Sequence, residues 1–142
     1  MRPRMLLCLA GAVVAASFSG CGGPAPVKLA PVDAVVKING QPAADILVQF
    51  LPDVSSAEPA VTATGTTDAS GKAVLMASNG QPGAMVGTNK VVLADLNEER
   101  PPQGKPLTRK PRLPSHYMVL GAQSPEVLVR QDGNTPFEIA IQ

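Results

Sequence analysis

The sequence has few aromatic residues and almost no histidine. Among its 142 residues there are no tryptophans, one tyrosine and three phenylalanines, and His116 is the single histidine. Glycan recognition by aromatic stacking is therefore disfavoured, a Ser/His/Asp set would depend on His116 alone, and zinc motifs with two histidines are absent. The neighbouring carboxylates Glu98 and Glu99 would point in different directions in an extended chain, which argues against glycosidase chemistry. We therefore expect no enzymatic activity, no cofactor, no metal and no small-molecule substrate.

Cysteine is scarce and charge is nearly balanced. Cys8 and Cys21 are the two cysteines, and removal of a leader over residues 1–20 would leave one thiol, which excludes an internal disulfide. The formal net charge is +1, and without Arg2 and Arg4 of that leader ten basic residues face eleven acidic ones. A balance of −1 does not imply nucleic acid as a partner.

The N-terminus has the pattern of an export signal. Positive charge in the first four residues precedes an apolar run of 12 residues, Met5–Ala16, which is shorter than the roughly 20 residues that a membrane span needs. The sequence of Ser19, Gly20 and Cys21 resembles the processing site of bacterial lipoproteins, in which the leader is cut before a cysteine whose thiol is lipidated. The resemblance implies a signal peptide over 1–20 and a lipid on Cys21, with palmitate among its acyl chains. An ordinary secretory leader is the alternative.

Apolar or β-branched residues recur in the pattern of short strands along the rest of the chain. Alternation with period two and 15 prolines with 13 glycines favour strands and turns over long helices. After a Gly- and Pro-rich tether over 21–31, we expect one all-β domain over 32–142, an antiparallel sandwich of about seven strands of transthyretin-like or immunoglobulin-like type. The expected strands are Val32–Ile38, Ile46–Leu51, Val61–Thr67, Lys72–Ala77, Asn89–Ala94, Val127–Arg130 and Phe137–Gln142.

Turn residues predict how some of these strands are joined. Asn39 and Gly40 suit the positive φ angles of a tight hairpin turn, and Asp68 is expected to cap the turn that ends at Gly71. A calcium site at Asp68 is the competing interpretation, but it would need further oxygen ligands that Ala69 does not offer. We expect the strands on either side of this turn to pair, and the last two strands of the chain to form a closing hairpin.

A long exposed loop is predicted over residues 97–114, which include five prolines. One hypothesis is a patch for an anionic partner such as phosphate headgroups, cell-wall polymer or nucleic acid. The alternative is a solvated loop whose cations are partly balanced by Glu98 and Glu99, and screening by salt favours it. A short extended segment with Tyr117, Val119 and Leu120 is expected to follow and to pack back on the sandwich. The cations of the candidate patch are Lys105, Arg109, Lys110 and Arg112.

The order of these motifs resembles the small lipoproteins of planctomycete-type bacteria that carry a carboxypeptidase-regulatory-like, transthyretin-like domain. The resemblance covers nearly all of residues 21–142 and implies a seven-stranded sandwich without catalytic residues. Ala73 and Asn89 stand where that family has bulky residues, so Met76 or Met85 is expected to fill the space. The motifs are Asn39–Pro42, Val48–Pro52, Thr67–Gly71, Gly83–Gly87, Val91–Leu93 and Leu113–Tyr117.

Together these features predict a non-catalytic, lipid-anchored protein of the cell envelope. The first hypothesis is a binding or adhesion module for a protein partner in the envelope, and the second is a structural spacer without a specific ligand. A transthyretin-like hydrolase is a distant alternative, because such enzymes use several histidines and end in a Tyr-Arg-Gly-Ser type of sequence. Gly22 stands where enterobacterial lipoproteins retained in the inner membrane carry Asp. We therefore expect the outer membrane, facing the periplasm or the cell surface.

Overall fold

Strands dominate the described part of the chain. A computed structural model describes residues 26–53, 59–99, 102–106, 108–133 and 136–142, and these residues form eleven strands and one short helix, α1 (Ser115–Met118). The seven strands of three or more residues overlap the seven predicted segments, and four two-residue strands account for the higher number. The all-β prediction is confirmed. The strands are β1 (Leu29–Ala30), β2 (Asp33–Ile38), β3 (Gln41–Pro42), β4 (Ile46–Pro52), β5 (Ala63–Thr66), β6 (Lys72–Val74), β7 (Met76–Ala77), β8 (Ala84–Met85), β9 (Gly87–Asp95), β10 (Glu126–Val129) and β11 (Phe137–Ile141).

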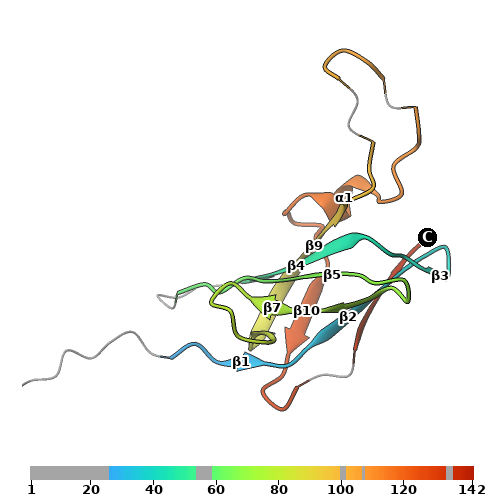
Figure 1. Cartoon of the computed structure of the whole chain (residues 1–142). Coiled ribbons are helices and arrows are strands. Elements are labelled where there is room, and N and C mark those ends of the chain that lie inside the picture. Colours follow the sequence, from blue (N-terminus) through green and yellow to red (C-terminus); the bar gives the residue numbers. More distant parts are fainter. Residues whose placement is uncertain (1–25, 54–58, 100–101, 107, 134–135) are drawn as a thin grey trace, which may run out of the picture.

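Two sheets pack face to face to form the sandwich (Figure 1). One has the order β10-β9-β4-β5-β7, the other has the order β11-β2-β3 with β6 also on β2, and β1 pairs separately with β8. All pairs are antiparallel except β11 with β2. The core lies between the sheets, where the rings of Phe50 and Phe137, from opposite sheets, meet edge to face with centroids 6.4 Å apart.

Period-two alternation determines which side chains enter that core. In β4 the buried residues are Ile46, Val48 and Phe50, whereas the residues between them are only half-buried. A fully buried aliphatic or aromatic side chain contributes roughly 1.5–3 kcal/mol relative to an exposed one. Pairing of β4 with β5 stops at Phe50, two residues before Pro52, which has no amide proton to donate.

One predicted strand pairing is wrong and another is only partly right. The last two long strands do not form a hairpin: β10 pairs with β9 in one sheet, and β11 runs parallel to β2 in the other. Residues 130–136 separate them, which is long for a tight turn and enough to cross the sandwich. The strands around Asp68 also separate, because β5 and β6 lie in different sheets and only β7 returns to pair with β5.

Both predicted turns form. Asn39 and Gly40 have φ angles of +51° and +78°, as a tight hairpin turn requires, although the turn leads into the two-residue β3 before the chain enters the other sheet. The Asp68 carboxylate accepts hydrogen bonds from the N–H groups of Ser70 and Lys72, at 2.8 and 3.1 Å. These bonds, and one from the Ser70 hydroxyl, hold the connection between the two sheets in place.

A buried asparagine replaces the bulky residue that the resemblance leads one to expect in β9. Asn89 is 1% exposed and its amide donates to the carbonyl oxygens of Met85 and Gly87 at 2.8 and 3.0 Å. It therefore satisfies two backbone acceptors at the bend between β8 and β9, while its Oδ1 has no partner among the described residues. Met85 is buried, but Met76 is 44% exposed and does not fill the core.

Two further segments differ from the sequence prediction. The tether includes β1, in which Ala30 is buried and pairs with Ala84, so residues 29 and 30 are part of the fold. Tyr117 lies in the helical turn α1 instead of an extended segment and packs against the core. The expectation that Val119 and Leu120 pack back on the sandwich is wrong, because these two residues are 65% and 53% exposed.

Candidate functional site

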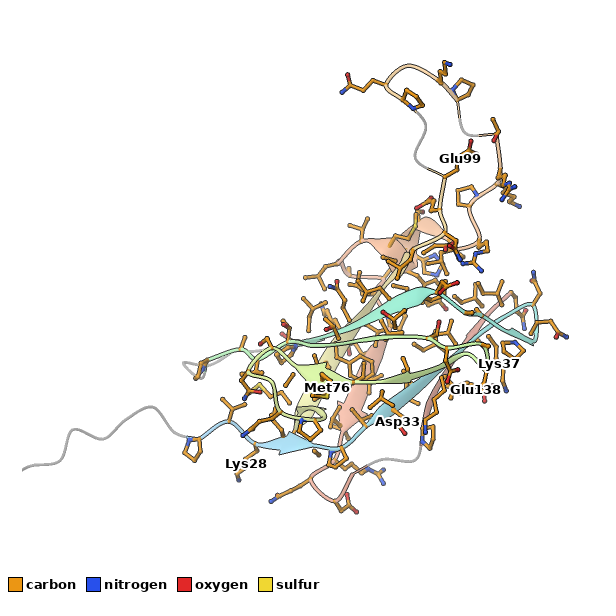
Figure 2. The ribbon with its side chains drawn as sticks, viewed as in Figure 1. Lys28, Asp33, Lys37, Met76, Glu99 and Glu138 are labelled. Carbon is orange, nitrogen blue, oxygen red and sulfur yellow. The ribbon has the colours of Figure 1, made fainter. Side chains whose placement is uncertain are left out.

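A connection after β9 stands away from the sandwich. We call residues 96–112 the arm. Figures 1 and 2 show it projecting from one end of the molecule, with Glu99 on its outgoing side. Its described residues are exposed except for the half-buried Glu98, in agreement with the predicted loop.

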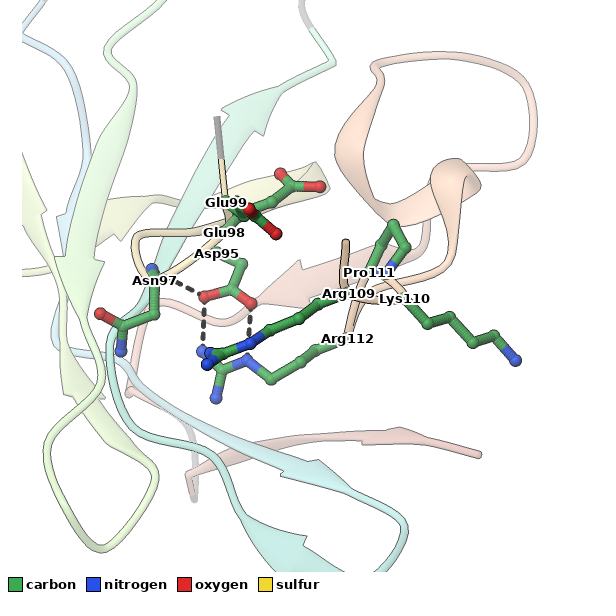
Figure 3. A pocket seen from close by; sticks show the side chains of 8 residues that line it. All are labelled: Asp95, Asn97, Glu98, Glu99, Arg109, Lys110, Pro111 and Arg112. Carbon is green, nitrogen blue, oxygen red and sulfur yellow. Dashed lines mark hydrogen bonds and ion pairs between the residues drawn. The ribbon is translucent and has the colours of Figure 1, made fainter. Parts of the chain in front are cut away.

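One ion pair closes the base of the arm. The side chain of Asp95, the last residue of β9, is 4% exposed, and Arg112 donates to both of its oxygens, with 2.6 Å between Nε and Oδ2. The N–H of Asn97 adds a third hydrogen bond at 2.9 Å. The Arg112 guanidinium is the main cause that lowers the pKa of Asp95, against the opposing effect of burial. We call the Asp95–Arg112 pair the clasp (Figure 3).

The clasp is joined to the connection between β3 and β4. The N–H of Leu96 donates to the carbonyl oxygen of Asp45 at 2.9 Å, and the Asn97 side-chain amide donates to the Asp45 carboxylate at 2.8 Å. Arg112 also donates to the carbonyl oxygen of Ala44 at 3.4 Å. Asp45 makes these contacts from a left-handed conformation with φ of +59°, which Asp adopts more readily than most residues. The arm therefore starts and ends on a base that is fixed to the body.

A second link crosses the arm farther out. The N–H and the hydroxyl of Thr108 both donate to one oxygen of Glu99. The hydroxyl bond is the main cause that lowers the pKa of the Glu99 carboxyl. Because both groups are exposed to water, this link contributes far less to stability than the clasp.

The structure separates the four cations that the sequence places in one anionic-partner patch. Arg112 is committed to the clasp, and Arg109 extends toward the same side, whereas Lys110 points away from them (Figure 3). Lys105 lies farther along the arm and is exposed. The pocket between the two sides of the arm, about 420 Å³ in volume, is lined by three acidic and three basic residues. It is electrically balanced and has no clear preference for an anion.

A larger cavity lies on the other side of residues 110–112. Its volume is about 690 Å³, and we call it the end groove. The sequence gives little sign of it, because its floor comes from β2 and β11, which are far apart in the chain. The one local signal is the apolar and proline-rich run 111–114. The end groove is lined by Ile38, Asn39, Lys110, Pro111, Arg112, Leu113, Pro114, Ile141 and Gln142.

Cys21 and the leader lie outside the described residues. His116 is exposed, and the centroid of its ring lies 4.4 Å from that of Tyr117. Within the described ranges there is no group of three or more His, Cys, Asp or Glu residues able to hold a metal ion. No helix in the described part of the chain has the length and apolar character to span a membrane.

No family model, no curated protein and no solved structure matches the chain. The all-β sandwich is thus established by the structure alone, and the resemblance to planctomycete-type lipoproteins stays a prediction. The arm, its clasp and the end groove are the features from which a function can be argued.

Proposed function

We propose that the chain is a non-catalytic, lipid-anchored protein of a bacterial cell envelope that binds a protein partner through its arm. The lipid is attached to Cys21 after removal of residues 1–20, and the protein sits in the outer membrane, facing the periplasm or the cell surface. The sequence pattern of the leader supports the anchor, and the arrangement of the two ends of β9 supports the binding role.

The observation that carries this proposal is the distance between the N-terminal segment and the arm. The N-terminal segment is held by β1, which pairs with β8, and the N–H of Val86 donates to the carbonyl oxygen of Lys28 at 2.9 Å. Val86 directly precedes β9, whose nine residues span about 27 Å before the arm begins. Figure 2 shows Lys28 and Glu99 at opposite ends of the molecule. A domain attached through its N-terminus therefore presents the arm away from the attachment.

The fixed base of the arm also favours binding. Ordering a loop on association opposes binding by about 0.5–1.5 kcal/mol for each side chain that becomes immobilised. The clasp and the bonds to Asp45 order both ends of the arm before any partner arrives.

Affinity purification of the lipidated protein from its native envelope, followed by mass spectrometry, tests the binding role. Replacement of Lys105, Arg109 and Lys110 by Ser should remove the partner, while Arg112 is left in place to preserve the clasp. A matched variant with Lys28, Lys72 and Lys90 changed to Ser removes the same charge from the body and should retain the partner. An unchanged set of captured proteins in the arm variant would exclude the arm as the binding surface, and a wild-type chain that captures no protein would instead favour a structural spacer.

Incorporation of a palmitate analogue tests the anchor. The wild-type chain should carry the label and be retained in the membrane fraction. Substitution Cys21→Ser should abolish both the label and the membrane retention, without changing the thermal unfolding of the domain. A wild-type chain that is secreted without label would contradict lipid anchoring.

A further inference from the structure

The end groove has an apolar floor built where two parallel strands end together. Ile38 is the last residue of β2 and Ile141 the last of β11, and the two are direct partners in the parallel register. The N–H of Asn39 donates to the carbonyl oxygen of Ile141 at 2.8 Å, which fixes the two strand ends to each other. Leu113, 3% exposed, closes the floor from the returning side of the arm.

The wall of the end groove is preformed. Pro111 and Pro114 line it, and proline restricts φ to about −65°, so this short segment has few alternative conformations. Arg112, between them, is held to Asp95 by the clasp. An occupant would therefore meet a wall that is already in place, which lowers the entropy lost on binding.

The charge of the end groove differs from that of the pocket between the two sides of the arm. Among the described residues, no Asp or Glu side chain lines the groove, and the cationic side chains that line it are Lys110 and Arg112. Arg112 already has a counterion in Asp95, whereas Lys110 has no hydrogen bond or ion pair with the described residues. Lys110 also lines the neighbouring pocket, but Figure 3 shows its side chain directed away from the acidic residues there. The groove therefore combines an apolar floor with one available ammonium group at its rim.

We propose that the end groove binds an apolar side chain from a segment of a partner protein, with an adjacent carboxylate of that segment paired to Lys110. The groove lies beside the clasp, at the end of β9 far from β1, and so away from the lipids to which the chain is attached. This position favours a protein segment over a membrane lipid. The proposal rests on the proposed function for the existence of a partner, and it adds where that partner binds and with which chemistry.

The four isoleucines of the chain make a direct test possible. Ile38 and Ile141, the latter 3% exposed, line the groove, whereas Ile46 and Ile139, which are also buried, do not line it. The full mature chain, labelled with ¹³C at the isoleucine δ1 methyl groups and held in detergent, is titrated with the peptide acetyl-Gly-Asp-Leu-Asp-Gly-amide. We expect saturable shifts at Ile38 and Ile141 and none at the other two.

Matched peptides separate the two parts of the proposed contact. Replacing both Asp residues of the peptide by Asn should weaken binding about fivefold, the value of one exposed ion pair of about 1 kcal/mol. Replacing the peptide's Leu by Ser should abolish the shifts. The variant Lys110→Gln should bind the acidic peptide as weakly as the neutral one, whereas Lys105→Gln, an equal charge change elsewhere on the arm, should bind normally.

Several results would overturn the proposal. Silent methyl groups at Ile38 and Ile141, or equal shifts of all four isoleucines, would exclude peptide binding in the groove. Shifts produced by octanoate but by none of the peptides would point to a lipid ligand instead. The Cys21→Ser chain should give the same shifts as the lipidated one. A wild-type chain that is not lipidated would therefore contradict the proposed lipid anchor and leave the groove proposal standing. Silent methyl groups at Ile38 and Ile141 would contradict the groove proposal and leave the lipid anchor standing.

Discussion

Loss of the clasp should destabilise the fold more than loss of any exposed ion pair. The substitution Arg112→Gln leaves the Asp95 carboxylate, 4% exposed, with the Asn97 N–H as its remaining hydrogen-bond donor. Breaking a fully buried pair from one side costs about 3–5 kcal/mol. Because the Arg112 side chain is 41% exposed and water can partly replace it, we expect about 2–3 kcal/mol, or a fall in Tm of about 10 °C for a domain of this size.

The pH dependence of that loss has a definite sign. In the wild type the guanidinium lowers the pKa of Asp95 from its ordinary value of 3.8, so the clasp contributes its full stability above that value and loses it as pH falls through the lowered pKa. In the variant, burial without a counterion raises the pKa of Asp95 instead. Acidification from pH 7 to 5 should then stabilise the variant relative to the wild type, and the difference in unfolding free energy should narrow.

Urea unfolding at pH 7 and pH 5 measures both effects. The control is Lys72→Gln, which removes an ion pair with Asp33 whose side chains are 44% and 32% exposed, and which should change stability by less than about 1 kcal/mol. The double variant with Asp95→Asn and Arg112→Gln should be more stable than Arg112→Gln alone, because no buried charge is left without a counterion. The reasoning fails if Arg112→Gln is no worse than Lys72→Gln, or if the difference does not narrow at pH 5.

Two further substitutions test the structure around the N-terminal end of β9, each by urea unfolding against a nearby control. At Gly83 φ is +100° and an added Cβ would lie 2.1 Å from the carbonyl oxygen of Ala30. Gly83→Ala should therefore detach β1 and lower stability by more than about 2 kcal/mol. Its control, Gly80→Ala, has φ of +83° but open space around the added Cβ, and should lower stability by only about 1 kcal/mol. Asn89→Ala removes the side-chain donor to two backbone carbonyl oxygens and should lower stability by about 2–3 kcal/mol. Its control, Thr88→Ala, changes an exposed neighbour and should alter stability by no more than about 0.5 kcal/mol. Equal losses within either pair would contradict the packing described here.

Alternation along the chain predicts which residues enter the core but not which strands become neighbours. The inward positions of β4 and β9 follow from period two, because successive side chains of a strand face opposite sides of the sheet. That pattern is the same in either sheet of a sandwich. Chain proximity therefore favoured a hairpin of the last two strands, whereas the observed pairing of Ile139 with Val36 joins residues about a hundred positions apart. Turn chemistry was more informative at Asn39 and Gly40, where the required φ angles are local.

The sequence contains one local signal for the clasp. Asp95 continues the alternating series of Val91 and Leu93, so it occupies an inward position where a carboxylate needs a cation or several donors. The spacing of the basic residues in the arm predicts a single group of cations available to a partner. Which of them would turn inward depends on how the arm returns to its base, and spacing along the chain does not determine that.

Because the side chains of Arg109 and Lys110 point in different directions, single substitutions can distinguish the two cavities beside the arm. The two are adjacent in sequence, yet Arg109 extends toward Asp95 and Lys110 points away from it (Figure 3). Single substitutions by Ser should therefore have different effects on the partner captured from the envelope. Lys110 lines both cavities, whereas Arg109 lines only the pocket between the two sides of the arm. Loss of the partner with Lys110→Ser but not with Arg109→Ser would therefore favour the end groove. Loss with Arg109→Ser alone would place the contact in the pocket between the two sides of the arm and contradict the groove proposal.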